Sequence, residues 1–141
     1  MTRNDTRARS VRGIIVGHGS LPDALLDAAS SILGRPEGIE TLRTQGLSAA
    51  ELEQRLNRLA EAEPGNAVVV FVDMFGSSCS TVSLKVQRSR PNLAVVCGVN
   101  LPMILRFISH RDRDDFPKLV EEVRRAQANG PDSVGPAVGG R

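Results

Sequence analysis

The amino-acid sequence predicts an α/β fold, built as an open, mostly parallel, doubly wound sheet of about four strands with helices on both faces. Short apolar segments alternate with longer ones whose apolar residues recur every three or four positions, which is typical of alternating strands and helices. The short segments are apolar at nearly every position, as expected of strands that helices cover on both sides. Right-handed crossovers then give a parallel sheet.

The first strand is expected at residues 12–17, where the apolar run RGIIVG ends in glycine. A helix is expected over residues 20–33, because its apolar residues are spaced to share one face. Ser20 and Asp23 have the spacing of a capping box at its start. After a Gly-Arg-Pro break, residues 39–43 are the second expected strand.

The second half of the chain continues the alternation. Ser48 and Glu51 form another capping-box pattern and predict a helix to about residue 62. The strongest strand signal is AVVVFV at residues 67–72, which Asp73 follows directly. The same signals then predict a helix, a strand and two more helices, at residues 79–88, at 93–96, from about 102, and at 115–127.

The chain has 141 residues, the size of one compact domain. All the expected elements fall within residues 12–128. Residues 1–11 are rich in arginine and are expected to be a flexible N-terminal extension. Residues 129–141 are rich in glycine and proline and are expected to be a flexible C-terminal tail.

Composition argues against several functions. Aromatic residues make up 3% of the chain, without Trp or Tyr, so we expect no nucleic-acid partner that relies on base stacking. No apolar run reaches the roughly 18 residues of a membrane span, and a cytoplasmic location is expected. Cys79 and Cys97 form no CxxC motif and are expected to be free thiols. Without a nucleotide fingerprint or a His/Cys cluster, we expect neither cofactor nor metal.

His18 is the strongest candidate for chemistry, because it lies between two glycines directly after the first strand. The glycines leave the imidazole open to a large partner. The helix that follows offers unpaired N–H groups and the positive end of its dipole. A phosphoryl group on His18 would therefore be an anion at a helix N-terminus. We expect Gly19 and Ser20 to bind it, and because Pro22 lacks an N–H, the backbone donors are expected from Ser20 and Leu21. The alternative is a histidine that only fills a loop, which is the usual case for a lone histidine. The flanking glycines, the strand end and the helix start favour the functional interpretation.

Asp73 ends the strongest strand, so it lies at the same edge as His18 if strands one and three are neighbours. Its carboxylate could then hold one ring nitrogen and leave the other as the nucleophile. It could instead cap the next turn. Ser77 and Ser78 precede a helix, as simple N-caps or as a second cradle for phosphoryl oxygens. These residues predict a phosphohistidine carrier that takes phosphate from another phosphoprotein.

Between residues 11 and 126 the chain contains, in order, the segments VRGIIVGHGSLPDALLDAASSILG, VVVFVDMFGSS and CGVNLPMIL. Together they resemble the enzyme IIA component of the mannose-family (mannose, fructose, sorbose) sugar phosphotransferase system. The resemblance implies a doubly wound α/β fold that is usually dimeric, so a homodimer is expected. It also implies that His18 is the phosphorylated histidine, Asp73 its hydrogen-bonded aspartate and Ser78 the serine of the following loop.

The same resemblance places further residues at the site. Asn100 and Pro102 fall in the family's Gly-Val-Asn-x-Pro loop, and Phe75 stands where the family often has Trp. The implied phosphoryl donor is the histidine-containing phosphocarrier protein, itself charged from phosphoenolpyruvate by enzyme I. The implied acceptor is a IIB subunit, which phosphorylates a sugar during import, with peripheral association to a membrane permease.

Three other functions stay open at this point. A regulatory phosphorylation sensor, or the phosphocarrier subunit of a dihydroxyacetone kinase, would keep the chemistry and change its output. A tetrapyrrole metal chelatase can also end its first strand in His-Gly-Ser, but that chemistry needs a second histidine near the sheet edge, where this chain offers Asp73. A non-catalytic module would bind a phosphorylated ligand without covalent phosphate on His18.

Overall fold

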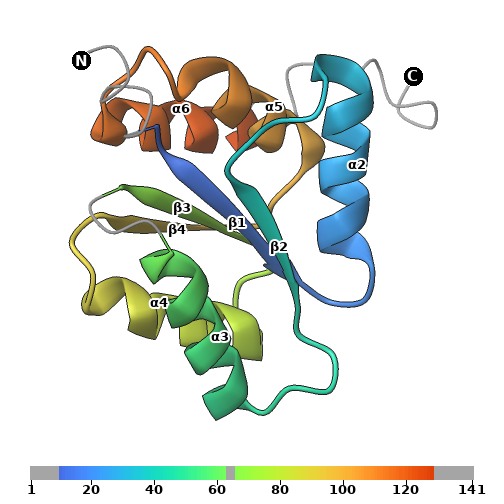
Figure 1. Ribbon diagram of the computed structural model, residues 1–141, viewed down its shortest axis with the longest axis vertical. Helices are drawn as coiled ribbons and strands as arrows, with labels where there is room; N and C mark the ends of the chain where they lie inside the picture. Colours follow the sequence, from blue (N-terminus) through green and yellow to red (C-terminus); the bar gives the residue numbers. More distant parts are fainter. Residues whose placement is uncertain (1–9, 63–65, 129–141) are drawn as a thin grey trace, which may run out of the picture.

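The computed structural model describes residues 10–62 and 66–128, and it consists of one sheet between two layers of helices (Figure 1). The elements follow in the order β1 (Arg12–Gly17), α2 (Leu21–Leu33), β2 (Ile39–Arg43), α3 (Ala49–Glu61), β3 (Val68–Val72), α4 (Ser78–Arg88), β4 (Leu93–Cys97), α5 (Leu101–His110) and α6 (Phe116–Ala128). The expected element order and fold class are confirmed, and element ends differ from the predictions by about one residue.

The four strands are all parallel and lie in the order β2-β1-β3-β4. The chain passes from β1 outward to β2 and then returns to the other side of β1 as β3. This reversal places the topological switch point between β1 and β3, where open parallel sheets bind their ligands. Val16 pairs with Val72, so the residues that follow both strands emerge level with each other at this edge.

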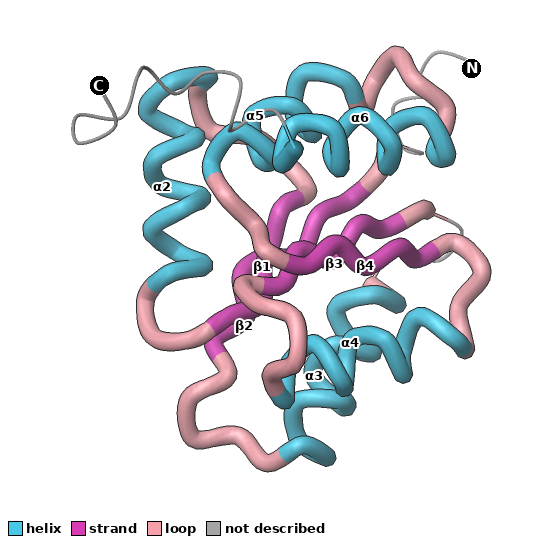
Figure 2. The backbone as a smooth tube through the Cα atoms, turned by 180° about the vertical axis from the view of Figure 1, so that it is seen from behind, coloured by secondary structure: helices cyan, strands magenta, loops and turns pink. Residues whose placement is uncertain are grey.

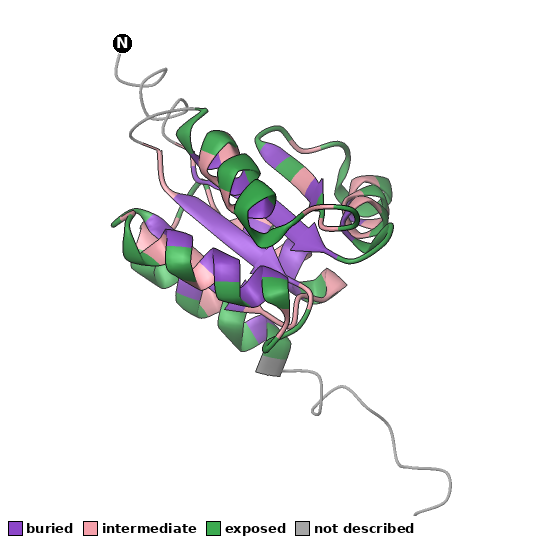
Figure 3. Cartoon of the chain, turned by 90° about the horizontal axis from the view of Figure 1, so that it is seen from below, coloured by how far each residue is buried: buried purple, intermediate pink, exposed green. Residues whose placement is uncertain are grey.

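Helices cover both faces of the sheet, with α2, α5 and α6 on one side and α3 and α4 on the other (Figures 1 and 2). Side chains alternate along each strand, so Ile15 and Phe71 pack into the α2–α5–α6 core and Ile14 and Val70 into the α3–α4 core. The two central strands, β1 and β3, are buried along their whole length, whereas β2 is partly exposed. Figure 3 shows the outer helix faces exposed. The sheet is therefore a rigid platform for the loops at its carboxyl edge.

The two expected capping boxes have different outcomes. Ser48 and Glu51 form the box reciprocally, as predicted. The Ser20–Asp23 box is wrong, because Ser20 makes no side-chain cap bond at the start of α2. The Asp23 carboxylate instead accepts hydrogen bonds from Thr41 and from the guanidinium of Arg43 on β2. The contact to Arg43 is a charge-assisted hydrogen bond between two side chains of opposite charge, and the unused Ser20 hydroxyl is left at the site edge.

The expected extension and tail lie almost wholly outside the described residues. Val11, at the end of the expected extension, is buried against the core. Within residues 10–62 and 66–128, no helix is long and apolar enough to cross a membrane.

Candidate active site

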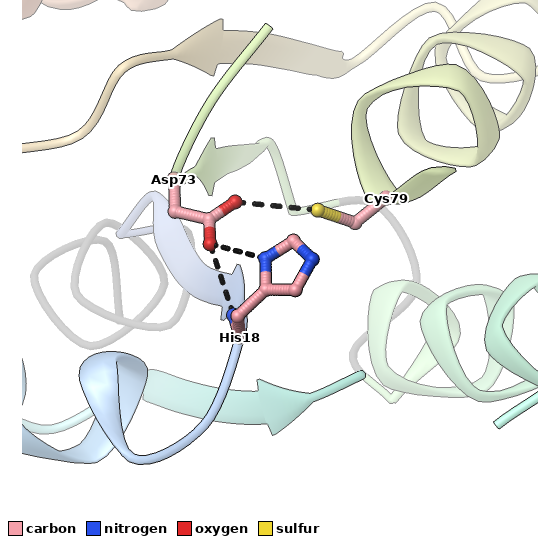
Figure 4. Close-up of side chains that lie close together, drawn as sticks. All are labelled: His18, Asp73 and Cys79. Atoms are coloured by element: carbon pink, nitrogen blue, oxygen red, sulfur yellow. Dashed lines mark hydrogen bonds and ion pairs between the residues drawn. The ribbon is translucent and has the colours of Figure 1, made fainter. Parts of the chain in front are cut away.

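His18 and Asp73 meet at the switch point between β1 and β3. The sequence analysis expected this contact on the condition that the two strands are neighbours, and they are paired. The Nδ1 atom of His18 lies 2.7 Å from Asp73 Oδ2, and the His18 backbone N–H donates to the same oxygen at 2.9 Å. Figure 4 shows the imidazole held along one edge by the carboxylate, with its other nitrogen pointing away. The carboxylate therefore fixes both the backbone and the ring of His18.

Two glycines make this close approach sterically feasible. A Cβ atom on Gly17 would lie 3.0 Å from Asp73 Oδ2, so a side chain there would press on the carboxylate. Gly19 has a φ of +56°, a left-handed conformation that glycine adopts without strain. This turn lets the chain leave β1 and start α2 within three residues, which places His18 beside the first turn of that helix.

The two side chains differ strongly in exposure. The His18 side chain is 59% exposed, whereas the Asp73 side chain is 8% exposed. Burial raises the pKa of Asp73, but hydrogen bonds from the His18 ring, the His18 backbone and Cys79 outweigh burial, so the pKa lies below its usual range. An ionised carboxylate can only accept hydrogen bonds. Nδ1 is therefore the protonated nitrogen of the neutral ring, and Nε2 carries the lone pair.

Cys79 is a third member of the site, and the sequence analysis treated it only as a free thiol. Its Sγ donates to the second carboxylate oxygen, Asp73 Oδ1, at 3.4 Å, and lies 3.1 Å from Ser77 Oγ. The thiol is free and buried, and burial is the main reason that its pKa is raised. The only sequence signal was its position in the first turn of α4, a few residues after Asp73.

The candidate phosphoryl-binding residues lie at two helix N-termini beside His18. Neither Gly19 nor Ser20 uses its N–H in a hydrogen bond within the described residues. The expectation that Leu21 offers a free N–H is wrong, because the turn after β1 brings His18 O within 3.2 Å of it as an acceptor. Ser77 is the N-cap of α4 and also donates to Met74 O, so its hydroxyl is already engaged. Ser78 is exposed in the first turn of α4.

The Ser78 hydroxyl makes no hydrogen bond to another described residue. It is therefore the freer of the two serine hydroxyls that the sequence analysis singled out for phosphoryl binding.

The loop after β4 reaches the same edge of the sheet, because β4 is parallel to β3 and pairs with it. Asn100 accepts a hydrogen bond from Met103 N–H at 3.0 Å and caps α5, and Pro102 stands exposed in the first turn. The Asn100 side chain thus has a structural task that shapes this loop.

Large apolar side chains are exposed around this edge. Phe75 is 75% exposed and Met74 54% exposed, both in the loop after Asp73, and Leu21 is 42% exposed at the start of α2. Exposed large apolar groups beside a reactive side chain are typical of a surface that meets another protein.

Among the described residues, one group of side chains has the donors and the spacing to hold a metal ion. The ligand atoms of His18, Asp73 and Cys79 all lie within 4.8 Å of one another. His110, the other histidine of the chain, is at the far end of α5, where it binds Asp114, so it cannot join this group.

Comparison with known proteins identifies relatives of the chain. Residues 13–124 match the family model EIIA-man, described as the PTS system fructose IIA component. The chain is 30% identical over 111 residues to the PTS system mannose-specific EIIAB component of Escherichia coli, an alignment that covers 76% of this chain and 34% of that protein. The chain thus spans about a third of the length of that relative.

Two further relatives are nearer in length. The PTS system fructose-specific EIIA component of Bacillus subtilis is 27% identical over 113 residues, which cover 79% of this chain and 77% of that protein. The crystal structure of phosphotransferase system component EIIA from Streptococcus agalactiae has a TM-score of 0.78 at 24% identity, covers 85% of this chain and 94% of that one, and shares the fold. The family model extends over most of the chain, which belongs to the EIIA-man family of phosphotransferase-system IIA components.

Proposed function

We propose that the chain is a phosphohistidine carrier, in which His18 accepts a phosphoryl group from the histidine-containing phosphocarrier protein and passes it to a IIB subunit. The observation that carries this proposal is the hydrogen bond between His18 Nδ1 and the buried Asp73 carboxylate. It leaves Nε2 as an exposed nucleophile with a fixed direction. Membership of the EIIA-man family supports the same role.

The transfer itself conserves protons and electrons. The Nε2 lone pair attacks the phosphorus of the donor's phosphohistidine and forms a new N–P bond. The donor's own N–P bond breaks, and its electron pair returns to the donor imidazole. Transfer onward repeats the step, with His18 as the leaving group. No proton has to move to or from Nε2, because Asp73 keeps the ring proton on Nδ1.

Electrostatics favour the phosphorylated state on both sides of the ring. When Nε2 bonds to phosphorus while Nδ1 keeps its proton, the ring becomes cationic, and Asp73 faces that charge at 2.7 Å. The phosphoryl oxygens lie on the opposite side of the ring from the carboxylate. We propose that the N–H groups of Gly19 and Ser20, which make no hydrogen bond to another described residue, and the hydroxyl of Ser78 supply hydrogen bonds there.

The apolar rim of Leu21, Met74 and Phe75 supplies the contact surface for the protein partners. Such a surface suits a carrier that must bring two phosphohistidines within bonding distance, because apolar contacts serve donor and acceptor alike. We further propose that the chain acts in the cytoplasm as a homodimer and associates peripherally with a membrane permease.

The tetrapyrrole chelatase alternative loses its main requirement. A second histidine would have to stand near His18, but His110 lies at the end of α5. Its neighbour Arg111 donates to Val11 O, just before β1 begins, so His110 is at the opposite edge of the sheet.

The proposal is tested by incubating the chain with phosphoenolpyruvate, enzyme I and the phosphocarrier protein. We expect a phosphoprotein that is labile in acid and stable in base, absent in His18→Ala and unchanged in His110→Ala. Adding a IIB subunit should discharge it. A folded chain that gains no phosphate from any cognate carrier, or that gains it equally in His18→Ala, would refute the proposal.

A further inference from the structure

Cys79 adds a sulfur ligand to the edge where His18 and Asp73 already meet (Figure 4). The three side chains offer one nitrogen, one oxygen and one sulfur, all within 4.8 Å of one another. We propose that this triad binds Zn²⁺, and that the bound ion blocks phosphorylation of His18. The inference departs from the sequence analysis, which expected no metal.

The donor set points to zinc rather than to a harder cation. Imidazole nitrogen, carboxylate oxygen and thiolate sulfur are the three ligand types that Zn²⁺ takes in proteins, whereas Mg²⁺ and Ca²⁺ prefer oxygen. Three protein ligands with one open position are also a recurring zinc arrangement. The thiolate is the selective element, so Cys79 rather than Asp73 decides which ion the triad prefers.

Small movements of the side chains complete the geometry. Tetrahedral zinc with bonds of about 2.0–2.3 Å holds its ligands roughly 3.5 Å apart. The Cys79 Sγ to Asp73 Oδ1 distance is already 3.4 Å, and the His18 Nδ1 to Asp73 Oδ2 distance of 2.7 Å has to open. The His18 side chain is 59% exposed, so its ring has room to rotate and the ion can enter from solvent.

Two hydrogen bonds now connect the Asp73 carboxylate to its neighbours, one from His18 Nδ1 and one from Cys79 Sγ. Zinc would take the place of the proton in each of these bonds. Ligation through Nδ1 needs the lone pair of that atom, so the proton of the neutral ring moves to Nε2. Ligation through Sγ releases the thiol proton to solvent. Each ion therefore binds with the loss of one proton and with no change of oxidation state.

This proton shift explains why zinc and phosphate compete for the site. A protonated Nε2 has no lone pair with which to attack phosphorus. The carboxylate that would stabilise a cationic ring is also neutralised by the ion. The zinc form of the chain is thus unable to accept a phosphoryl group, although His18 remains exposed.

Metal binding can be measured without any phosphotransfer. Co²⁺ serves as the probe, because a thiolate ligand gives it a charge-transfer absorption band in the near ultraviolet. We expect one Co²⁺ per chain with this band, displaced by one Zn²⁺.

The matched variants are Cys79→Ser and Cys97→Ser, since Cys97 is the chain's other free thiol and lies outside the triad. Cys79→Ser should lose the band and bind Zn²⁺ at least about tenfold more weakly. Loss of an outer-shell partner already weakens metal binding by about tenfold or more, and loss of a direct ligand should cost at least as much. Cys97→Ser should keep both. Circular dichroism checks that each variant is folded. A band that persists in Cys79→Ser, or a folded wild-type chain that gives none, would overturn the proposal.

The second readout rests on the proposed function and is therefore interpreted separately. Phosphoryl labelling of each variant is compared with its own rate without zinc, in the same donor mixture. Zinc should slow labelling of the wild type and Cys97→Ser, and leave the rate of Cys79→Ser near its zinc-free value. Equal slowing of all three would show that zinc acts elsewhere. If no variant is labelled even without zinc, the proposed function fails and the Co²⁺ result alone decides the metal site.

Discussion

The replacement Asp73→Asn tests how much of the phosphorylation of His18 depends on the carboxylate. It removes the negative charge that faces the ring at 2.7 Å and keeps the size of the side chain. The unphosphorylated ring is neutral and loses only a hydrogen bond to charge. The phosphorylated ring is cationic and loses an ion pair, so the variant should disfavour the phosphorylated state.

The size of the effect follows from Coulomb's law. Unit charges roughly 4 Å apart interact by about 4 kcal/mol at an effective dielectric constant of 20, and by about 1 kcal/mol in bulk water. The His18 side chain is 59% exposed and Asp73 is nearly buried, so we take an intermediate value of about 2 kcal/mol. This energy corresponds to roughly a 30-fold shift in the phosphorylation equilibrium. If half the ring charge has developed in the transition state, the rate falls roughly fivefold.

The assay is rapid-quench phosphorylation from the phosphocarrier protein, read as acid-labile phosphate on the chain. Asp27→Asn is the matched control, because Asp27 is exposed on α2, outside the site, and the net charge changes equally. An Asn amide can also present its NH₂ to Nδ1 and favour the wrong tautomer, so both factors are lower bounds. A folded Asp73→Asn chain within twofold of the wild type in rate and equilibrium would refute the role given to Asp73.

Three further predictions concern the cap, the rim and the titration of the carboxylate. Ser48→Ala should lower the free energy of unfolding by about 1 kcal/mol in urea titrations, whereas Ser20→Ala, whose hydroxyl caps nothing, should stay within about 0.5 kcal/mol of the wild type. Phe75→Ala should raise KM for the phosphocarrier protein roughly tenfold, with stability unchanged, because its exposed ring adds little to the core and is proposed to be buried on docking; an unchanged KM would remove Phe75 from the docking surface. Because the pKa of Asp73 is lowered on folding, its carboxylate stabilises the fold above the ordinary value of 3.8 and loses this effect as pH falls through the lower folded value. The difference in unfolding free energy between the wild type and Asp73→Asn should therefore shrink below pH 3.8, and a difference that grows there would have the wrong sign.

The fold was predictable because most of the strands are short, largely apolar runs, β3 without interruption, and the helices between them have apolar faces. Strand β2 (Ile39–Arg43) is the exception, since it carries polar residues between Ile39 and Leu42. The positions of His18 and Asp73 followed from the same pattern. Two parallel strands that each end in a polar residue bring those residues to one edge, provided the strands are neighbours. Sequence alone left that neighbour relation as a condition, and the pairing of Val16 with Val72 satisfies it.

Tertiary contacts decided what the sequence could not. The Asp23 carboxylate had the spacing of a capping residue, but Arg43 on the adjacent strand binds it instead. Cys79 was expected only to be a free thiol, because its position along the chain does not specify that its sulfur meets Asp73. Each contact joins a residue on a helix to a residue at the end of a strand. The distance between such residues depends on how the helix packs against the sheet, which local sequence patterns do not specify.

The central claim is that Asp73 keeps the ring proton on Nδ1 and leaves Nε2 of His18 to bond phosphorus. The chain has two histidines, so nitrogen NMR of imidazole-labelled protein resolves each ring separately. After phosphorylation by the phosphocarrier protein, we predict a phosphorus coupling at Nε2 of His18, with Nδ1 still protonated and His110 unchanged. Phosphate on Nδ1 of His18, or on His110, would contradict the account.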